Sequence, residues 1–401
     1  MSIKKLPLMT AIAAVIAAPC ALAQSVTVYG KLYPHVLNEK GTGATAVGTP
    51  RSTLSSALPG VNGVPKNNGM TSGNSRFGIR GNEDLGGGLK AVFQLESSMA
   101  VENGTTSSPQ FWDRDIFVGL ESKQFGTLRL GQMDTIFKNY GDTLGILGVS
   151  SGTFMSSSNI LRKPGFGTSN AARFHERMGN SVQYESPEMA GFQFGVQVSD
   201  DGLASLAGDQ KAYSLGLKYD QGPFYVAIAH EIHDDYFGGS SQSPTALRNS
   251  IATGSAKDTA TQFTVEWRLN KQHKFEFDVI QKQYEESGAV GRFRSYKNTA
   301  YLLGMENRWT DQWRTAAHYV RSNAGSCSLI GGAACSTDGL DGSKLTLGAA
   351  YYFSRRTYGF GAIAKLTNGK SARFSTAQLS DARANYGEDL TQMAIGISHN
   401  F

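Results

Sequence analysis

Two short stretches of this 401-residue chain combine residue types that can do chemistry. The stretch 148–152 reads G-V-S-S-G, the spacing of a serine nucleophile, which requires a strand, a sharp turn and a helix around Ser150. It lies instead in a Ser/Gly-rich run. His230 and His233 flank Glu231, but on a strand these two imidazoles point to opposite faces and do not form a metal site. We therefore expect no catalytic residue, no metal and no cofactor.

A third set of residues could select ions. Arg76 and Arg80 alternate with apolar residues, and Arg129 and Lys31 stand in similar alternating segments. In a strand such alternation gives one basic and one apolar face. A basic face that lines a narrow water-filled passage creates a positive potential, and this favours anions.

The segments that carry these residues are parts of a long series with alternating polarity. We predict sixteen strands, with boundaries uncertain by several residues. They lie near residues 25–37, 74–81, 89–101, 112–121, 127–137, 180–187, 192–199, 212–220, 224–233, 260–269, 273–284, 296–308, 313–322, 344–353, 357–367 and 392–401.

The connections between these strands alternate in length. Those after even-numbered strands are short, such as 270–272 and 354–356, whereas those after odd-numbered strands are mostly long, such as 38–73 and 138–179. Aromatic residues gather near the strand ends. Both features are typical of outer-membrane barrels, with short turns at one end, long loops at the other and aromatic girdles. The sequence predicts an all-β fold, a 16-stranded antiparallel transmembrane β-barrel.

The N-terminus predicts export. Lys4 and Lys5 precede a short apolar run, and Ala21-Leu22-Ala23 resembles a cleavage site, so residues 1–23 are expected to be a signal peptide and 24–401 the barrel. Lipidation at Cys20 is an alternative, but Pro19 is unsuited to it. In an exported chain, the close cysteines Cys327 and Cys335 suggest a loop disulfide.

Composition excludes two other classes of protein. No apolar run of about 18 residues follows Ala23, which argues against a helical membrane protein. The formal net charge of +5 is too small to indicate a nucleic-acid partner.

The stretch 75–96, together with 114–120 and 126–132, resembles the trimeric general-diffusion porins of Gram-negative outer membranes. The terminal Phe401 looks like that family's barrel-assembly signal. The resemblance implies a homotrimer whose third long loop, 138–179 here, folds into the barrel and narrows it. It also implies that Arg114 and Arg177 belong to the basic wall, in which case Asp115 faces outward.

In that family, acidic residues on the inserted loop face the basic wall, and Asp134 and Asp142 are the candidates here. The Pro-Glu-Phe-Gly-Gly element of the enteric branch is absent. The loop instead offers four bases: Lys138, Arg162, Lys163 and Arg173. We therefore expect a positive constriction and a mild preference for anions.

The predicted function is passive diffusion of small hydrophilic solutes and inorganic ions across the outer membrane, in contact with lipid and lipopolysaccharide. Two alternatives remain open. A substrate-selective channel for acidic metabolites would show saturable conductance. An outer-membrane adhesin or structural protein would bind its partners through the long loops and would have a blocked lumen.

Overall fold

The computed structural model describes residues 25–106, 108–141, 143, 145–149, 151–167, 170–200, 210–379 and 383–401. The predicted signal peptide, Ser150 and Asp142 lie outside these residues. Within the described ranges, no helix has the length and hydropathy needed to cross a bilayer.

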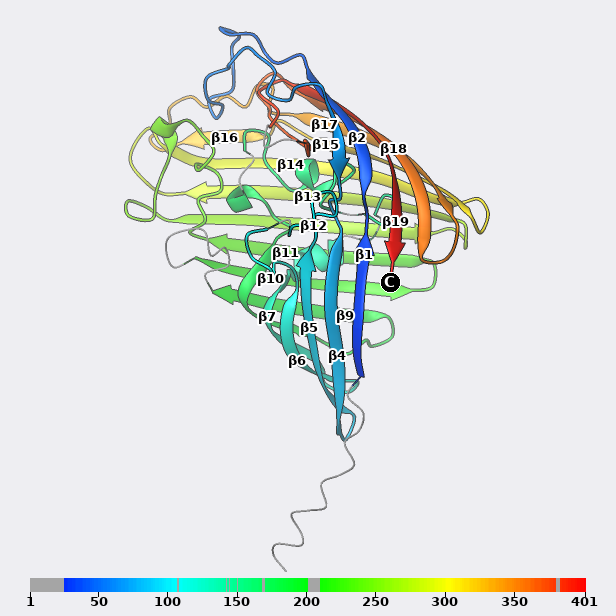
Figure 1. Ribbon diagram of the computed structural model, residues 1–401. Coiled ribbons are helices and arrows are strands. Elements are labelled where there is room, and N and C mark those ends of the chain that lie inside the picture. The colour runs from blue at the N-terminus through cyan, green and yellow to red at the C-terminus, as the bar shows by residue number, and fades with distance from the viewer. Residues whose placement is uncertain are drawn as a thin grey trace, which may run out of the picture.

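In the part of the chain that the structure describes, nineteen strands form one antiparallel sheet that closes on itself (Figure 1). They are β1 (Ser25–Leu32), β2 (His35–Thr42), β3 (Asn67–Thr71), β4 (Arg76–Gly86), β5 (Leu89–Ser98), β6 (Ile116–Ser122), β7 (Gly126–Asp134), β8 (Arg177–Glu185), β9 (Phe192–Asp200), β10 (Lys211–Gln221), β11 (Phe224–Asp234), β12 (Ala256–Arg268), β13 (His273–Glu286), β14 (Phe293–Arg308), β15 (Trp313–Ser322), β16 (Ser326–Leu329), β17 (Gly342–Tyr352), β18 (Thr357–Asn368) and β19 (Asp389–Asn400). The short helices are α1 (Ile136–Gly141), α2 (Ser158–Leu161), η1 (Asn170–Ala172) and η2 (Thr245–Leu247).

These strands make sixteen crossings of the barrel. β1 and β2 form one crossing, interrupted at Pro34, which has no N–H to give to the ladder. β3 and β4 form the next, and β16 is a short strand within a connection that pairs with the start of β14. β1 pairs with β4, and β2 pairs with β19, which closes the barrel. The predicted sixteen-stranded barrel is confirmed.

One predicted strand is longer than the strand in the structure. The segment expected over 127–137 ends at Asp134, and the chain turns into α1. Thr135 caps this helix, because its side-chain oxygen accepts a hydrogen bond of 3.2 Å from the N–H of Lys138.

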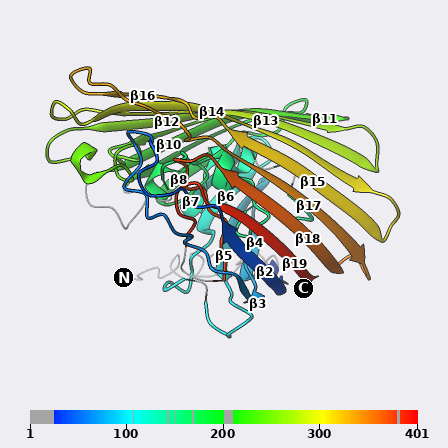
Figure 2. The ribbon, with the colours of Figure 1, turned by 90° about the horizontal axis from the view of Figure 1, so that it is seen from above.

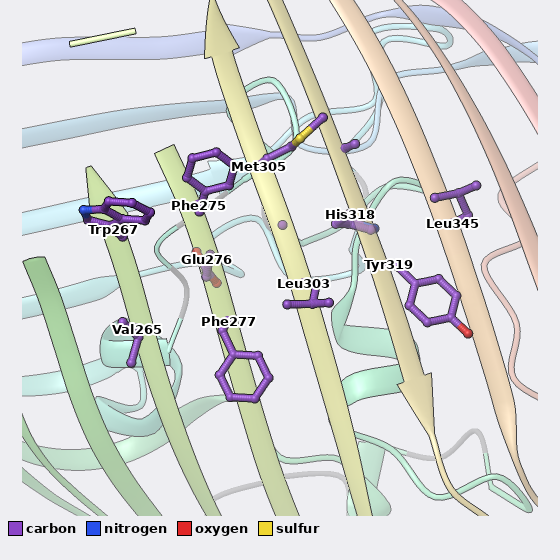
Figure 3. A pocket seen from close by; sticks show the side chains of 12 residues that line it. Val265, Trp267, Phe275, Glu276, Phe277, Leu303, Met305, His318, Tyr319 and Leu345 are labelled. Carbon is purple, nitrogen blue, oxygen red and sulfur yellow. The ribbon is translucent and has the colours of Figure 1, made fainter. Parts of the chain in front are cut away.

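Apolar residues cover the outer face of the barrel. On β12–β17 the side chains of Val265, Phe277, Leu303 and Leu345 point outward, as Figure 3 shows, around a shallow apolar groove. Leu303 is 61% exposed, whereas the neighbouring side chain His318 is buried on the opposite side of the sheet. An exposed apolar band on alternate residues is the surface that a barrel presents to lipid.

The connection between β7 and β8 runs over residues 135–176, and the helices among its described residues lie against several strands of the barrel (Figure 2). α1 contacts β9–β12, and α2 contacts β14, β15 and β17. Side chains that alternate with the outward apolar residues donate hydrogen bonds to its backbone carbonyls. These donors are Lys31 to Gly148, Tyr225 to Tyr140, Lys282 to Leu161, Tyr284 to Ala172, Lys344 to Ser156 and Tyr358 to Leu147, over 2.6–3.2 Å.

Candidate ion-selective constriction

Four predicted bases lie on strands of one part of the sheet: Lys31 on β1, Arg76 and Arg80 on β4, and Arg129 on β7, which is separated from β4 by β5 and β6. The register places the first three together, because Lys31 pairs with Arg76 and Thr27 pairs with Arg80. Val28, Leu128 and Leu130, which alternate with these bases, are exposed on the outside, as the alternation predicts. The strands thus present one basic wall.

Glu96 on β5 is a shared acceptor within this wall. The guanidinium of Arg114 binds one oxygen of the carboxylate, and Arg76 Nε lies 3.6 Å from the other. The Tyr29 hydroxyl donates to the same group at 2.9 Å. Two arginines therefore share a single negative charge.

Arg114 and Asp115 are adjacent in the chain, yet both contact inward-facing groups. The N–H of Glu96 donates to the carbonyl of Asp115, and the N–H of Arg114 donates to the carbonyl of Glu96. The two residues directly before β6 thus oppose the single residue Glu96, which is the pattern of a β-bulge and breaks the alternation. Asp115 therefore lies beside Arg177 and not at the expected outward position, and Arg114 binds Glu96.

Asp115 and Asp134 both bind Arg177. The Arg177 guanidinium lies 2.6 Å from Asp115 and 2.7 Å from Asp134, and Lys138 Nζ lies 3.0 Å from Asp134. Asp134 ends β7, directly opposite Arg177 in the β7–β8 register. It therefore stands within the basic wall, and the expected position on a loop across the passage is wrong. β7 includes this residue, and the cap of α1, Thr135, follows it directly.

The remaining bases differ in their partners. Arg129 Nη1 lies 2.6 Å from Glu185. Among the described residues, neither Lys31 nor Arg80 has a carboxylate within 4.0 Å; each lies over a tyrosine ring, with the cationic group 4.6 and 4.8 Å from the ring centroid. Cation–π contacts hold these groups without neutralising their charge.

Positive charge exceeds negative charge in this region. The bases are Lys31, Arg76, Arg80, Arg114, Arg129, Lys138 and Arg177, and the carboxylates paired with them are Glu96, Asp115, Asp134 and Glu185. Arg76, Arg114 and Arg129 remain partly exposed, with 25–31% of each side chain accessible. A cavity of about 220 Å³ is lined by Arg80, Arg129 and other residues of these strands.

The other predicted loop bases are held inside the protein. Arg162 is buried and donates to Gln262 at 3.0 Å and to the carbonyl of Gly141 at 2.9 Å. Arg173 pairs with Glu176. Burial lowers the pKa of Lys163 to about 7, and the nearby charge of Arg173 acts in the same direction.

Several residues of this region were not predicted. Glu96 and Glu185 stand on the basic face of their strands, and alternation with the apolar Leu95 and Val182 could have found them. Lys282 and Lys344 support the β7–β8 connection, but nothing in the local sequence signals a partner so distant in the chain.

Three further predicted features have clear positions. Cys327 and Cys335 form a disulfide, with Cα atoms 5.7 Å apart. Phe401 pairs with Gly30 through two backbone hydrogen bonds of 3.1 and 3.2 Å, at the seam of the barrel. His230 bonds to Thr261 on the outer face, whereas His233 is buried beside Glu231.

Comparison with known proteins identifies the family. The model of the Gram-negative porin family matches residues 10–371. An outer membrane porin protein of Bordetella pertussis is 35% identical over 177 residues, which are 41% of this chain and 43% of that protein. The major outer membrane protein P.IB of Neisseria meningitidis serogroup A is 32% identical over 222 residues, which are 55% of this chain and 58% of that protein. The matches thus span about half the length of these curated relatives.

Solved structures share the fold. The anion-selective porin from Comamonas acidovorans superimposes with a TM-score of 0.68 at 20% identity, covering 94% of this chain and all of that one. The trimer form of OmpT from Vibrio cholerae gives a TM-score of 0.63 at 16% identity, with the same coverage. Because the family model matches most of its length, the chain belongs to the Gram-negative porins.

Proposed function

We propose that this outer-membrane barrel is a water-filled channel, rather than an enzyme, through which small hydrophilic solutes and inorganic ions diffuse passively, with a mild preference for anions. Residues 1–23 direct its export and are removed. The described residues contain no group of three or more His, Cys, Asp or Glu side chains that could hold a metal ion, and the proposed function requires none.

The observation that carries the proposal is the unequal charge of the basic wall. Lys31 and Arg80 are held by aromatic rings, and Arg76 and Arg114 share Glu96. A net positive charge beside a narrow aqueous passage raises the local concentration of anions. Pairing of the other bases keeps this potential modest.

The β7–β8 connection is proposed to set the width of the passage. It contacts β9–β12 through α1 and β14, β15 and β17 through α2, and Gly148 accepts a hydrogen bond from Lys31 on β1. Because the β7–β8 connection is bonded to the barrel strands at these separate points, the part of the passage that stays open is proposed to lie beside the basic strands. This arrangement supports a role for Lys31 and Arg76 at the narrowest point.

The protein is proposed to act as a homotrimer in contact with lipid and lipopolysaccharide. One structural neighbour is described as a trimer and another as an anion-selective porin. The exposed apolar band on the outer face supports the lipid contact.

Single-channel recording in a planar bilayer tests the proposal. The refolded protein is expected to give a large conductance that closes in three equal steps and rises in proportion to KCl concentration. A conductance that saturates with an acidic metabolite would favour the substrate-selective alternative. Absence of conductance from correctly folded protein would refute the channel function.

A further inference from the structure

A second group of arginines lies at the end of the barrel that carries the short turns, on strands separate from the basic wall. Arg308 ends β14, and Arg314 stands at the start of β15. The two are direct cross-strand partners, and the exposed Trp313 beside Arg314 points outward, so both arginines face the interior. Like charges directly opposite each other destabilise a sheet. Folding alone therefore does not account for this pair.

Arg314 stacks on an aromatic ring, and it forms no ion pair with a carboxylate among the described residues. Its guanidinium carbon lies 4.0 Å from the ring centroid of Tyr352, which stacks on Tyr358 at 4.7 Å. Its Nε is buried and has no hydrogen-bond partner among the described residues. A buried donor of this kind calls for an explanation beyond packing. A planar guanidinium that stacks on a ring and has an unpartnered donor suits the two oxygens of a phosphate or carboxylate group.

The charged side chains around Arg314 carry a net positive charge. Arg308 pairs with Asp311 at 2.7 Å, but the Asp311 side chain is 90% exposed, so water and salt weaken that pair. Glu306 adds one carboxylate on the same face, and Arg355 on the β17–β18 turn adds a third guanidinium. Three positive groups thus stand against two negative ones.

The arginines line a cavity of about 500 Å³. Its lining includes Arg308, Arg314, Arg355, Gln312 and Tyr352. This volume is in the range that holds small ligands in proteins. The lining combines convergent cationic donors with an aromatic support, rather than the apolar surface of the outer groove.

We propose that this short-turn pocket binds small phosphate-bearing anions. It would hold such solutes transiently at the mouth of the channel, which lies on the periplasmic side in outer-membrane barrels. The proposal goes beyond passive diffusion, because diffusion requires no binding site. It does not depend on the charge of the basic wall.

Inorganic phosphate added to the short-turn side tests this site in planar bilayers. Phosphate is expected to reduce the chloride current in a saturable way, and Arg314→Gln is expected to raise the half-saturating concentration by about tenfold or more, since a bidentate ionic contact is lost. Arg308→Gln should have a smaller effect, because Asp311 already occupies part of that guanidinium. Arg321→Gln is the matched control, since Arg321 stands on the outer face of the same strand and is 57% exposed.

Calorimetric titration of the folded protein in detergent with phosphate provides a readout that does not require conduction. Binding by the wild type and its loss in Arg314→Gln would support the site even if the channel function failed. Equal phosphate affinity in the wild type and in Arg314→Gln, or no binding by the wild type in either experiment, would overturn the proposal.

Discussion

The ammonium of Lys31 lies 3.2 Å from the carbonyl oxygen of Gly148, so a base of the barrel wall directly contacts the β7–β8 connection. Lys31 is buried at this contact, and its charge is not paired with a carboxylate among the described residues. The same residue therefore supports the connection, and under the proposed function it adds positive charge beside it. In that proposal, this contact links the shape of the passage to its charge.

Glu96 should limit the anion preference, because it neutralises part of the charge on Arg76 and Arg114. Glu96→Gln removes that carboxylate and is expected to raise the chloride-to-potassium permeability ratio roughly twofold. Reversal potentials in a KCl gradient measure the ratio. Glu188→Gln, on an exposed short turn, is the control with the same change of charge. An unchanged ratio in Glu96→Gln would show that Glu96 does not face the ion path.

Arg80 should promote anion passage, since it lies over Tyr29 without a carboxylate partner among the described residues. Arg80→Gln is expected to lower the permeability ratio to roughly half in dilute salt, and the difference should shrink in about 1 M salt, where charges are screened within about 3 Å. Arg321→Gln again serves as the outer-face control. Equal effects of the two substitutions would argue against a lumenal role for Arg80.

Lys163 should make selectivity depend on pH. Its pKa is lowered to about 7 by burial and by Arg173, so its positive charge is lost as the pH rises through 7. Because the folded pKa lies below the unfolded value, this group also adds stability as the pH rises from about 7 to about 10.5. Reversal potentials at pH 6 and pH 8 should show a weaker anion preference at pH 8. Lys163→Met should reduce that difference, and an undiminished difference would assign the pH effect to other groups.

The disulfide between Cys327 and Cys335 should stabilise one loop without affecting conduction. A ring this small is expected to contribute about 2–3 kcal/mol to local stability. In a variant with Cys327→Ser and Cys335→Ser, subtilisin should cleave the connection 323–341 faster, while single-channel conductance stays the same. Equal cleavage rates with and without the bond would contradict a stabilising role.

Gly30 leaves room for Phe401 at the seam of the barrel. A Cβ atom at Gly30 would lie 2.4 Å from the Phe401 ring and 2.7 Å from the carbonyl oxygen of Arg76, too close for either. Gly30→Ala should therefore lower the yield of folded barrel, measured by the heat-dependent shift in gel mobility. Gly361→Ala is the control, since its Cβ would meet only one atom, at 3.8 Å. A normal yield for Gly30→Ala would show that the seam tolerates displacement of Phe401.

The strands could be predicted from the sequence because the lipid around a barrel requires apolar residues to alternate with polar residues along each strand. Residues such as Leu128, Arg129 and Leu130 could thus be assigned to the two faces of a strand from their alternation alone. The alternation failed where a bulge placed Arg114 and Asp115 on the same side.

Contacts between distant segments could not be predicted in the same way. Asp134 was assigned to the loop because only its position in the chain was known, and its pairing with Arg177 depends on where β7 ends. Likewise, the bond from Lys344 to Ser156 depends on the path of the β7–β8 connection, which no local pattern defines.

Uncompensated positive charge beside the β7–β8 connection is proposed to give the channel a mild anion preference. The reversal potential of the wild-type protein in a planar bilayer under a KCl gradient tests it most directly. A potential displaced toward the chloride equilibrium value is the predicted result. A reversal potential at zero, or one displaced toward the potassium value, would contradict the account.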